Sequence, residues 1–501
     1  MPKAKTRHPA GPRRAWRRGV LGAAAWAALA AAPLGTHARP AGAQEPAAGD
    51  TLAVEKVVAA GWEAARSDHH AEAAAHFRRA IEREPARRRE LLPELAVRMT
   101  FSGEAEAAVP LYREAIGWDL PPEEALRMRR HLALSLSWSR RFDEALAEYG
   151  ALAAADPGDV EARLGLARVL SWTGRLGPAE REYRAVLALD PAQREARRGV
   201  AQVRGWSGRP REARKLIEAY LREHPDDAEA RYVLAEGLAG MGRPDRARAV
   251  LAGNLAAHPE HRPSADLLAT LRLRSRPESR ADLQRTRRSD NLTYLTLTTA
   301  QGVRLNGGLT TVEAQFQRLD YDPRSGPGVD VEVNRPGLLV RHRLGDAAEA
   351  TAAPYLVSID PGAAEGRDLL GWDARLALWA GDALRAELAM TRAPFYDDVL
   401  SLVPGIHLTS GGGAVDFVPD IATRASLRGS WGRVSDGNRR AWLQGEAERR
   451  VLPRPVVLLG GQLSTIRFAE RRENGYFSPE DYRSALGTAK VFGNVGDRFY
   501  W

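Results

Sequence analysis

A period of 34 residues runs through the first half of the sequence and limits what this half can fold into. Proline recurs at this spacing, at Pro157, Pro191, Pro225 and Pro259. Two series of alanines keep the same spacing: Ala133, Ala167, Ala201 and Ala235, and Ala145, Ala179, Ala213 and Ala247. A fixed period of this length is typical of arrays of small units, each of which is too small to bury its apolar face alone.

Each unit has the residues that a helical hairpin needs. A small alanine on the first helix lets the second helix approach closely, and a proline stops the second helix. Glycine at Gly174, Gly208 and Gly242 ends the first helix with a backbone free to take positive φ. This pattern resembles the tetratricopeptide repeat family. The resemblance implies an α-solenoid with a concave binding surface over residues 50–273, with the clearest units between residues 124 and 259.

Two columns of residues recur within these units. Arginine occupies one position of the first helix, at Arg129, Arg163, Arg197 and Arg231. Nine residues later the units carry Trp138, Trp172 and Trp206. In the family the later position tends to face the concave groove, which makes the tryptophans candidate groove contacts; the alternative is that they pack between adjacent hairpins. The arginines are expected on a solvated face, paired with nearby glutamates.

The N-terminal segment carries most of the excess charge. The first 43 residues hold eight cations and no acidic residue, while the whole 501-residue chain has a net charge of +9. An apolar stretch from Gly19 to Leu34 follows the cations, and a small-x-small site lies at Ala41–Ala43. This layout predicts a cleaved signal peptide over residues 1–43, with a retained signal anchor as the alternative. Because the remainder is nearly neutral, no nucleic-acid partner is expected.

Residues 290–501 read as β-structure after a polar linker over residues 274–289. Apolar and polar residues alternate in ten to twelve segments, as at Trp372–Leu378 and, beyond a Gly381-Asp382 turn, at Leu384–Leu388. The segments are about 8–12 residues long, which is near the length needed for a tilted strand to cross a bilayer. A soluble sandwich would show the same alternation; the export signal and strand length favour a transmembrane β-barrel. The run Gly411–Gly413 is interpreted as a flexible loop between strands.

Three runs in this region resemble the carboxy-terminal domain of the cellulose synthase C subunit. The runs are Arg392–Ser401, Ser435–Arg440 and Gly475–Tyr482. The motif residues that carry the resemblance are Arg392, Pro394, Asp397, Gly475, Tyr476, Phe477, Ser478, Pro479 and Tyr482. Smaller outer-membrane families with few repeats and a related barrel are similar too. Because the family has further strands after the last run, the barrel is expected to be incomplete at Trp501.

The resemblance implies export of an exopolysaccharide, cellulose-like, through an outer-membrane barrel with its repeats in the periplasm. The implied partners are the polysaccharide chain, periplasmic and inner-membrane synthase components, and outer-membrane lipid. The alternative is a barrel-anchored scaffold that recruits periplasmic proteins without transporting a polymer. No phosphate-binding glycine loop, nucleophile elbow or cysteine is present, so no enzymatic activity, cofactor or metal is expected.

Overall fold

The computed structural model describes most of the chain after residue 47. The described residues are 48–287, 293–322, 324, 330–362, 365–395, 399–453, 456–473, 476–495 and 499–500. The predicted signal peptide, Asp397, Gly475 and Trp501 therefore lie outside the described residues. The chain divides into two compact units, one that ends at Val203 and one that begins at Arg204. The boundary falls inside a helix of the repeat array, and each unit is described by itself.

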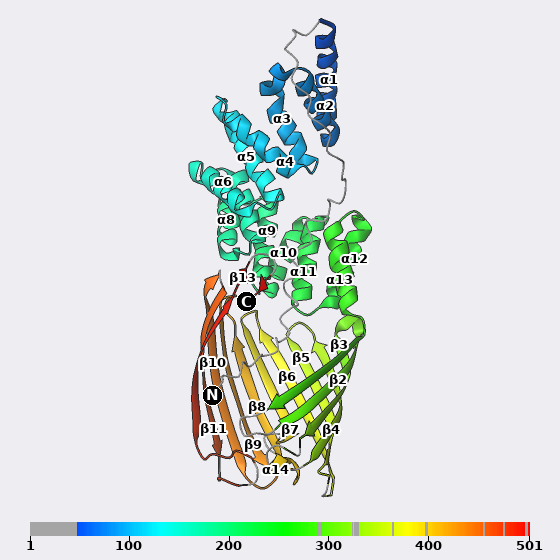
Figure 1. The fold of residues 1–501 in the computed structure, drawn as a ribbon, viewed down its shortest axis with the longest axis vertical. Coiled ribbons are helices and arrows are strands. Elements are labelled where there is room, and N and C mark those ends of the chain that lie inside the picture. Colours follow the sequence, from blue (N-terminus) through cyan, green and yellow to red (C-terminus); the bar gives the residue numbers. More distant parts are fainter. Residues whose placement is uncertain are drawn as a thin grey trace. The chain divides into compact units, whose positions relative to one another are not determined.

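The predicted order of helices and then strands is confirmed (Figure 1). The first unit contains α1 Ala48–Arg66, α2 His70–Arg83, α3 Arg88–Phe101, α4 Ala105–Ile116, α5 Pro122–Trp138, α6 Phe142–Ala155, α7 Val160–Trp172, α8 Leu176–Leu189 and most of α9 Arg194–Trp206. The second unit continues the array with α10 Pro210–Glu223, α11 Ala228–Gly240, α12 Pro244–Ala257 and α13 Arg262–Arg274.

The helix ends form where the repeat pattern places them. Gly174, Gly208 and Gly242 follow first helices and have φ values of 74°, 80° and 73°. Arg140 takes the corresponding place of an earlier unit and adopts the same left-handed conformation, with φ 61°. At the start of α7 the Asp159 carboxylate accepts a hydrogen bond from the backbone N–H of Ala162 at 2.9 Å. The small residues and caps of the sequence thus account for the hairpins.

In two hairpins, a tyrosine ring from the second helix fills the space over a glycine in the first helix of the following hairpin. A Cβ added to Gly165 would lie 2.2 Å from Cε1 of Tyr149. A Cβ added to Gly199 would lie 2.5 Å from Cζ of Tyr183. Both tyrosines are buried, so the glycines are required by packing and not by backbone conformation.

The second unit contains one large antiparallel sheet. Its strands are β1 Glu278–Arg287, β2 Thr293–Leu305, β3 Thr310–Tyr321, β4 Val331–Leu344, β5 Ala348–Asp360, β6 Arg367–Ala380, β7 Leu384–Pro394, β8 His407–Phe417, β9 Thr423–Val434, β10 Arg439–Pro453, β11 Val456–Phe468 and β12 Tyr482–Phe492. Each strand pairs with its neighbours in sequence order, so the sheet is an uninterrupted meander. Among the described residues β1 and β12 have one partner each, so the sheet is not closed into a barrel. A short helix, α14 Val399–Leu402, lies between β7 and β8, and the two-residue strands β13 Asn494–Val495 and β14 Phe499–Tyr500 pair with each other.

Two local predictions were wrong. The segment expected to be a linker contains β1, which pairs with β2 from Glu278↔Gly302 to Arg287↔Thr293. Its many charges resemble a linker because one face of this strand, as described below, is polar. The glycines expected in a loop, Gly411–Gly413, lie inside β8. A Cβ on Gly412 would stand 2.3 Å from the backbone oxygen of Gly429, so close strand approach explains the glycine run.

Candidate functional site: the two faces of the sheet

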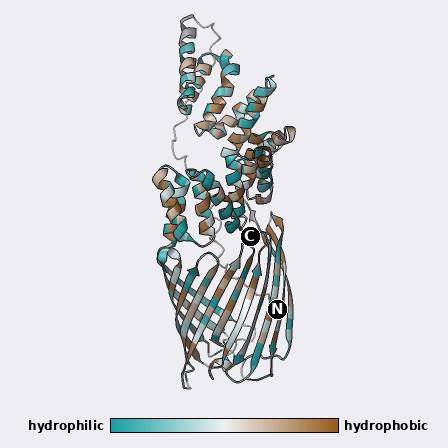
Figure 2. Ribbon diagram, turned by 180° about the vertical axis from the view of Figure 1, so that it is seen from behind, coloured by the Kyte–Doolittle hydropathy of each residue, from teal (hydrophilic) through white to brown (hydrophobic). Residues whose placement is uncertain are grey.

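The register of the strands sorts their residues onto two faces. Directly paired residues of an antiparallel sheet point to the same side. Leu376 pairs with Leu388, and Leu388 pairs with Gly413, so these positions share one face. Arg385 pairs with Asp416 on the other. We call the face of Leu388 the outer face and the face of Arg385 the inner face; the sheet that carries them is curved (Figure 1). Figure 2 shows hydrophobic and hydrophilic residues interspersed along the strands.

The outer face is apolar and exposed. Leu388 is 62% exposed and Leu463 is 67% exposed. Other large apolar side chains that are exposed on this face include Leu283, Val303, Leu338, Leu356, Leu370, Leu378, Met390, Val415, Phe417, Leu427, Trp431, Leu443 and Leu459. No described element packs over them. Apolar residues in such number are seldom left exposed on a protein that meets only water.

The inner face carries a ladder of ion pairs. Asp416 on β8 accepts from Arg385 of β7 at 3.0 Å and from Arg428 of β9 at 3.3 Å. Further pairs of the same face are Arg280–Glu313, Arg304–Glu278, Arg343–Glu349, Arg375–Asp373 and Lys490–Glu448. The pairs bring cations and anions together, but the described strands carry more arginines than carboxylates on this face, so it is charged with an excess of cations.

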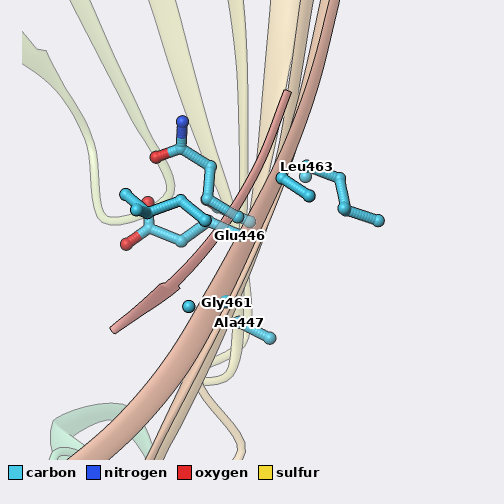
Figure 3. A pocket seen from close by; sticks show the side chains of 10 residues that line it. Glu446, Ala447, Gly461 and Leu463 are labelled. Carbon is cyan, nitrogen blue, oxygen red and sulfur yellow. The ribbon is translucent and has the colours of Figure 1, made fainter. Parts of the chain in front are cut away.

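The edge near β12 shows both faces at once. Figure 3 places Glu446 and Leu463 on opposite sides of the sheet. A soluble sheet would bury its apolar face and expose its charges to water. Here the apolar face is bare and the charges line the interior, which is the polarity of a sheet that has lipid outside and water inside.

One end of the sheet meets the helices of the same unit; we call it the helix end. The connections at this end are short, from residues 306–309 to 418–422, and span three to five residues where described. At the opposite end, the far end, the β7–β8 and β11–β12 connections span twelve and thirteen residues. Outer-membrane barrels have the same asymmetry, with short periplasmic turns and long external loops.

At the helix end two aspartates hold the repeats. Asp382, in the β6–β7 turn, accepts hydrogen bonds at 3.0 Å from the backbone N–H groups of Arg211 and Glu212 in the first turn of α10. Asp346, in the β4–β5 turn, accepts from Arg214 at 2.6 Å and also from Arg243 at the start of α12. Both contacts join chain segments more than a hundred residues apart. They fix α10 and α12 to the sheet within this unit.

We expect Asp346→Asn to weaken this junction at neutral pH only. Partial burial raises the pKa of Asp346, but hydrogen bonds from Arg214 and Arg243 outweigh it, so the pKa lies below its ordinary value. A lowered pKa gives stability that is present above about pH 4 and is lost as pH falls toward the folded-state pKa. Urea titrations at pH 7 and pH 3 should therefore separate wild type from variant by about 1–3 kcal/mol at pH 7 and much less at pH 3. An equal difference at both pH values would contradict the ionic role of Asp346.

The three motif runs of the sequence meet at the far end. Phe395, directly after Arg392 and Pro394, stacks on Tyr476 with ring centroids 4.8 Å apart. Phe468 lies 5.6 Å from the same ring. Ile406 and Val434 complete this small core, which we call the far-end core. The sequence runs that carry the resemblance thus build one structure, although Asp397 and Gly475 themselves are not among the described residues.

Polar bonds lock the far-end core in place. Tyr476 donates its hydroxyl to Asp436 at 2.8 Å, and buried Asn438 donates to the Glu470 carbonyl at 2.7 Å. Burial is the largest of the causes that raise the pKa of Tyr476 to about 12. The Ser478 hydroxyl donates to the Arg472 carbonyl at 2.9 Å. The role of these residues is therefore to hold the loops together.

The remaining motif residues sit around this core. The Pro479 carbonyl accepts from the Phe468 N–H at 2.9 Å. Phe477 and Tyr482 are exposed and contact each other edge to face at 5.4 Å. The Arg392 carbonyl accepts from the Tyr355 hydroxyl at 3.0 Å, while its side chain lies on the outer face. None of these contacts forms a catalytic arrangement.

Part of the interior at the far end is filled. Leu402 of α14 is fully buried against side chains of β3, β4 and β5. The members of this cluster on the strands are Leu319, Tyr321, Val331, Val333, Tyr355, Val357 and Ile359. The β7–β8 connection therefore folds inward and packs on the inner face, a feature that the alternation of the strands does not predict.

The tryptophans of the repeat column lie in both compact units of the chain. Trp138 is 46% exposed and contacts Phe101 of the preceding helical hairpin edge to face, with ring centroids 5.6 Å apart. Trp172 is half-buried and contacts Phe142 of the preceding hairpin at 6.4 Å. Trp206 belongs to the second unit and is half-buried. Trp138 and Trp172 pack between neighbouring hairpins, and Trp138 still offers much of its ring.

Two members of the arginine column pair with glutamates, as expected, while Arg231 pairs with Asp226 at 3.3 Å instead. Arg129 lies 3.0 Å from Glu148, and Arg163 lies 2.8 Å from Glu182. In each case the partner comes from the second helix of the same hairpin, nineteen residues on. The column is a feature of the hairpin's own surface.

Comparisons with known proteins concern the helical part. The model of the family described as "Tetratricopeptide repeat" matches residues 139–203 and 207–271, so the chain contains these repeats. A tetratricopeptide repeat protein from Parabacteroides merdae ATCC 43184 is 17% identical, with a TM-score of 0.36 over 44% of this chain and 93% of that one. A thermophilic repeat protein from Thermus thermophilus is 22% identical, with a TM-score of 0.33 over 37% of this chain and 99% of that one.

No curated protein matches the chain. Within the described residues, no helix has the length and apolar character needed to cross a bilayer. The family model thus establishes the repeats, and they fit a scaffold for protein–protein interaction.

Proposed function

We propose that this chain spans a bacterial outer membrane through its sheet and exports an exopolysaccharide, cellulose-like in its chemistry, along the inner face. The observation that carries the proposal is the inverted polarity of the sheet. Apolar side chains such as Leu388 and Leu463 are exposed outside, and ion pairs such as Arg385–Asp416 line the inside. A sheet with lipid on one side and water on the other has a use for both faces.

The inner face suits a neutral, hydroxylated chain. Several of its arginines, such as Arg280, Arg375 and Arg385, are paired with neighbouring carboxylates, so a passing polymer meets hydrogen-bonding groups of both signs. Trp379 on the same face is half-buried with the Arg343 guanidinium 4.0 Å from its ring centre, and the part of the ring that stays open offers a flat surface to a sugar ring. Such weak and repeated contacts permit movement, and no bond is made or broken.

The helix end supports a periplasmic position for the repeats. Short turns and the Asp346 and Asp382 contacts join this end to α10 and α12. The long connections lie at the other end, which is the external side in outer-membrane barrels. The predicted signal peptide of residues 1–43 and the three runs that resemble the cellulose synthase C subunit agree with this orientation. The repeats would then bind components of the synthase in the periplasm.

A second function is favoured by one observation. Leu402 of α14 is buried on the inner face, so the interior is partly occupied at the far end. A sheet that remained filled in this way would act as a membrane anchor, and the repeats alone would recruit periplasmic proteins. Both functions use the same membrane placement and differ only in whether a polymer passes.

Planar-bilayer recording distinguishes the two functions. The purified full-length chain should give a steady conductance that soluble cello-oligosaccharides block in a dose-dependent way. Leu402→Asp should raise the conductance, because it removes the apolar contact that holds α14 inward. Ala414→Asp, a charge change on the inner face of β8, serves as the control and should leave α14 in place. A chain that inserts but gives no glycan-sensitive current in either form would favour the anchor.

A further inference from the structure

Five arginines lie on the outer face close to the far end of β7 and of β9–β12. They are Arg392, Arg433, Arg439, Arg467 and Arg483, and we call them the arginine rim. Each lies within four residues of the far end of its strand. These side chains take no part in the functions proposed above for the inner face and for the repeats.

The register places these arginines side by side. Arg392 pairs with Thr409, Thr409 pairs with Arg433, and Arg433 pairs with Arg439. Paired residues share a face, so three guanidinium groups project from the same side within four adjacent strands. Each of these three arginines is separated by an even number of residues from an exposed leucine of its own strand, as Arg392 is from Leu388, so it lies on the same face as that leucine. The rim therefore continues the apolar outer face.

Carboxylate partners are scarce on the rim. Asp481 lies between Arg467 and Arg483, at 3.4 Å and 2.8 Å. Among the described residues no carboxylate pairs with the side chains of Arg392, Arg433 or Arg439, and the last two are exposed. Five cations thus face one anion. On β3, Arg318 lies three residues from the far end of the same face and, unlike the rim, is paired with both Asp320 and Glu332.

The other end of the same strands lacks such a rim. The outer positions at the helix end are Leu384, Phe417, Val457 and Val491, with Arg449 as the one cation among them. A tryptophan side chain also lies near the far end: Trp431 is 56% exposed on the outer face, two residues before Arg433. Tryptophan is enriched where a membrane protein crosses from hydrocarbon to headgroups. The arginines lie just beyond this level.

We propose that the arginine rim binds the phosphate groups of lipid headgroups at the far-end surface of the membrane. A guanidinium beside an apolar, lipid-facing surface cannot remain fully hydrated and needs an anion, and phosphate matches its fork of N–H donors in a bidentate manner. Neighbouring guanidiniums from adjacent strands would share a headgroup that carries more than one phosphate. The rim would thereby fix the depth of the sheet in the bilayer. This inference rests on the membrane placement proposed above.

The test compares lipid retention by matched variants of the full chain. Wild type and the triple variant R392Q/R433Q/R439Q are inserted into phosphatidylcholine nanodiscs doped with fluorescent phosphatidic acid. Because basic side chains at the surface attract anionic lipid, the triple variant should retain the anionic lipid at least about tenfold less well. The control R341Q/R424Q/R449Q removes three arginines near the helix ends of β4, β9 and β10, and should retain it as wild type does.

Two further arms make the outcome decisive. Inorganic phosphate in excess should not displace the lipid; displacement would mean that the rim is a site for free anions and would overturn the lipid assignment. Equal retention by all three proteins would overturn it too. Heat-modifiable gel migration of each variant reports insertion separately, so loss of lipid binding in an inserted protein leaves the proposed transport function standing.

Discussion

Leu388→Arg should destabilise the lipid-inserted protein by ~2–4 kcal/mol, the cost of an arginine at the lipid-facing midplane of a membrane barrel. Leu388 lies near the middle of β7, and its side chain is 62% exposed on the outer face. On a surface in water the same change would be nearly neutral, because an exposed leucine has few contacts to lose. The substitution therefore reports what the outer face touches. The measurement is the urea midpoint of the protein refolded into phosphatidylcholine vesicles, followed by the fraction of heat-modifiable band.

Leu189→Arg is the matched control for this change. Leu189 ends α8 in the repeats and is 50% exposed. Because this surface meets water, the substitution should shift the stability by no more than about 0.5 kcal/mol. If Leu388→Arg were equally harmless, the outer face would be in contact with water, and the membrane placement would be wrong.

Gly165→Ala should lower the stability of the first unit by ~1–3 kcal/mol, the usual range for overpacking a well-filled core. The new methyl group would lie 2.2 Å from a ring carbon of Tyr149, and that ring is buried. Neither helix can withdraw without disturbing the contacts of the next hairpin. The melting temperature of the helices, followed by circular dichroism at 222 nm, should fall by about 2–4 °C for each kcal/mol lost.

Gly150→Ala gives the opposite sign with the same chemical change. Gly150 also lies inside a helix of the first unit, and a Cβ there would meet nothing within 4 Å. Replacing a helical glycine by alanine removes backbone freedom from the unfolded chain, so this variant should gain up to about 1 kcal/mol. Two variants with equal melting temperatures would show that Tyr149 does not pack on Gly165 as described.

The repeat array could be predicted closely because its signal is repeated. A unit that departs from the pattern at one position can still be recognised from its neighbours. Arg140 stands where the later units have glycine, and its left-handed conformation follows from its place in the period. The tyrosine–glycine contacts were not predicted. They join residues of successive hairpins, and a glycine at Gly165 reads as a weak helix position until the ring above it is known.

The sheet was predicted in kind but not in detail. Alternation identified most strands, but it failed at β1, whose polar inner residues such as Arg280 and Asp282 resemble a linker. It failed again at Gly411–Gly413, where close strand approach removes the side chains on which alternation depends. The open pairing of β1 and β12 is a property of the whole sheet and has no signature in any single segment.

The contacts between the helix end of the sheet and the repeats could not be predicted from the sequence, although the turns that make them share one sequence feature. Asp346 and Asp382 both follow glycines of tight turns, Gly345 and Gly381, which have positive φ. A repeated Gly-Asp turn at one end of a sheet suggests a common partner. Without coordinates, however, nothing indicates that α10 and α12 supply it.

Spin labels on β7 test the central claim most directly, and the absence of native cysteines makes single labels simple to place. Ala386, Leu388 and Met390 should collide readily with molecular oxygen, which concentrates in lipid. The intervening positions Arg385 and Glu387 should collide with a water-soluble nickel complex instead. This alternation is predicted if lipid bathes the outer face and water the inner face; labels at Leu388 that respond to nickel as strongly as those at Glu387 would contradict it.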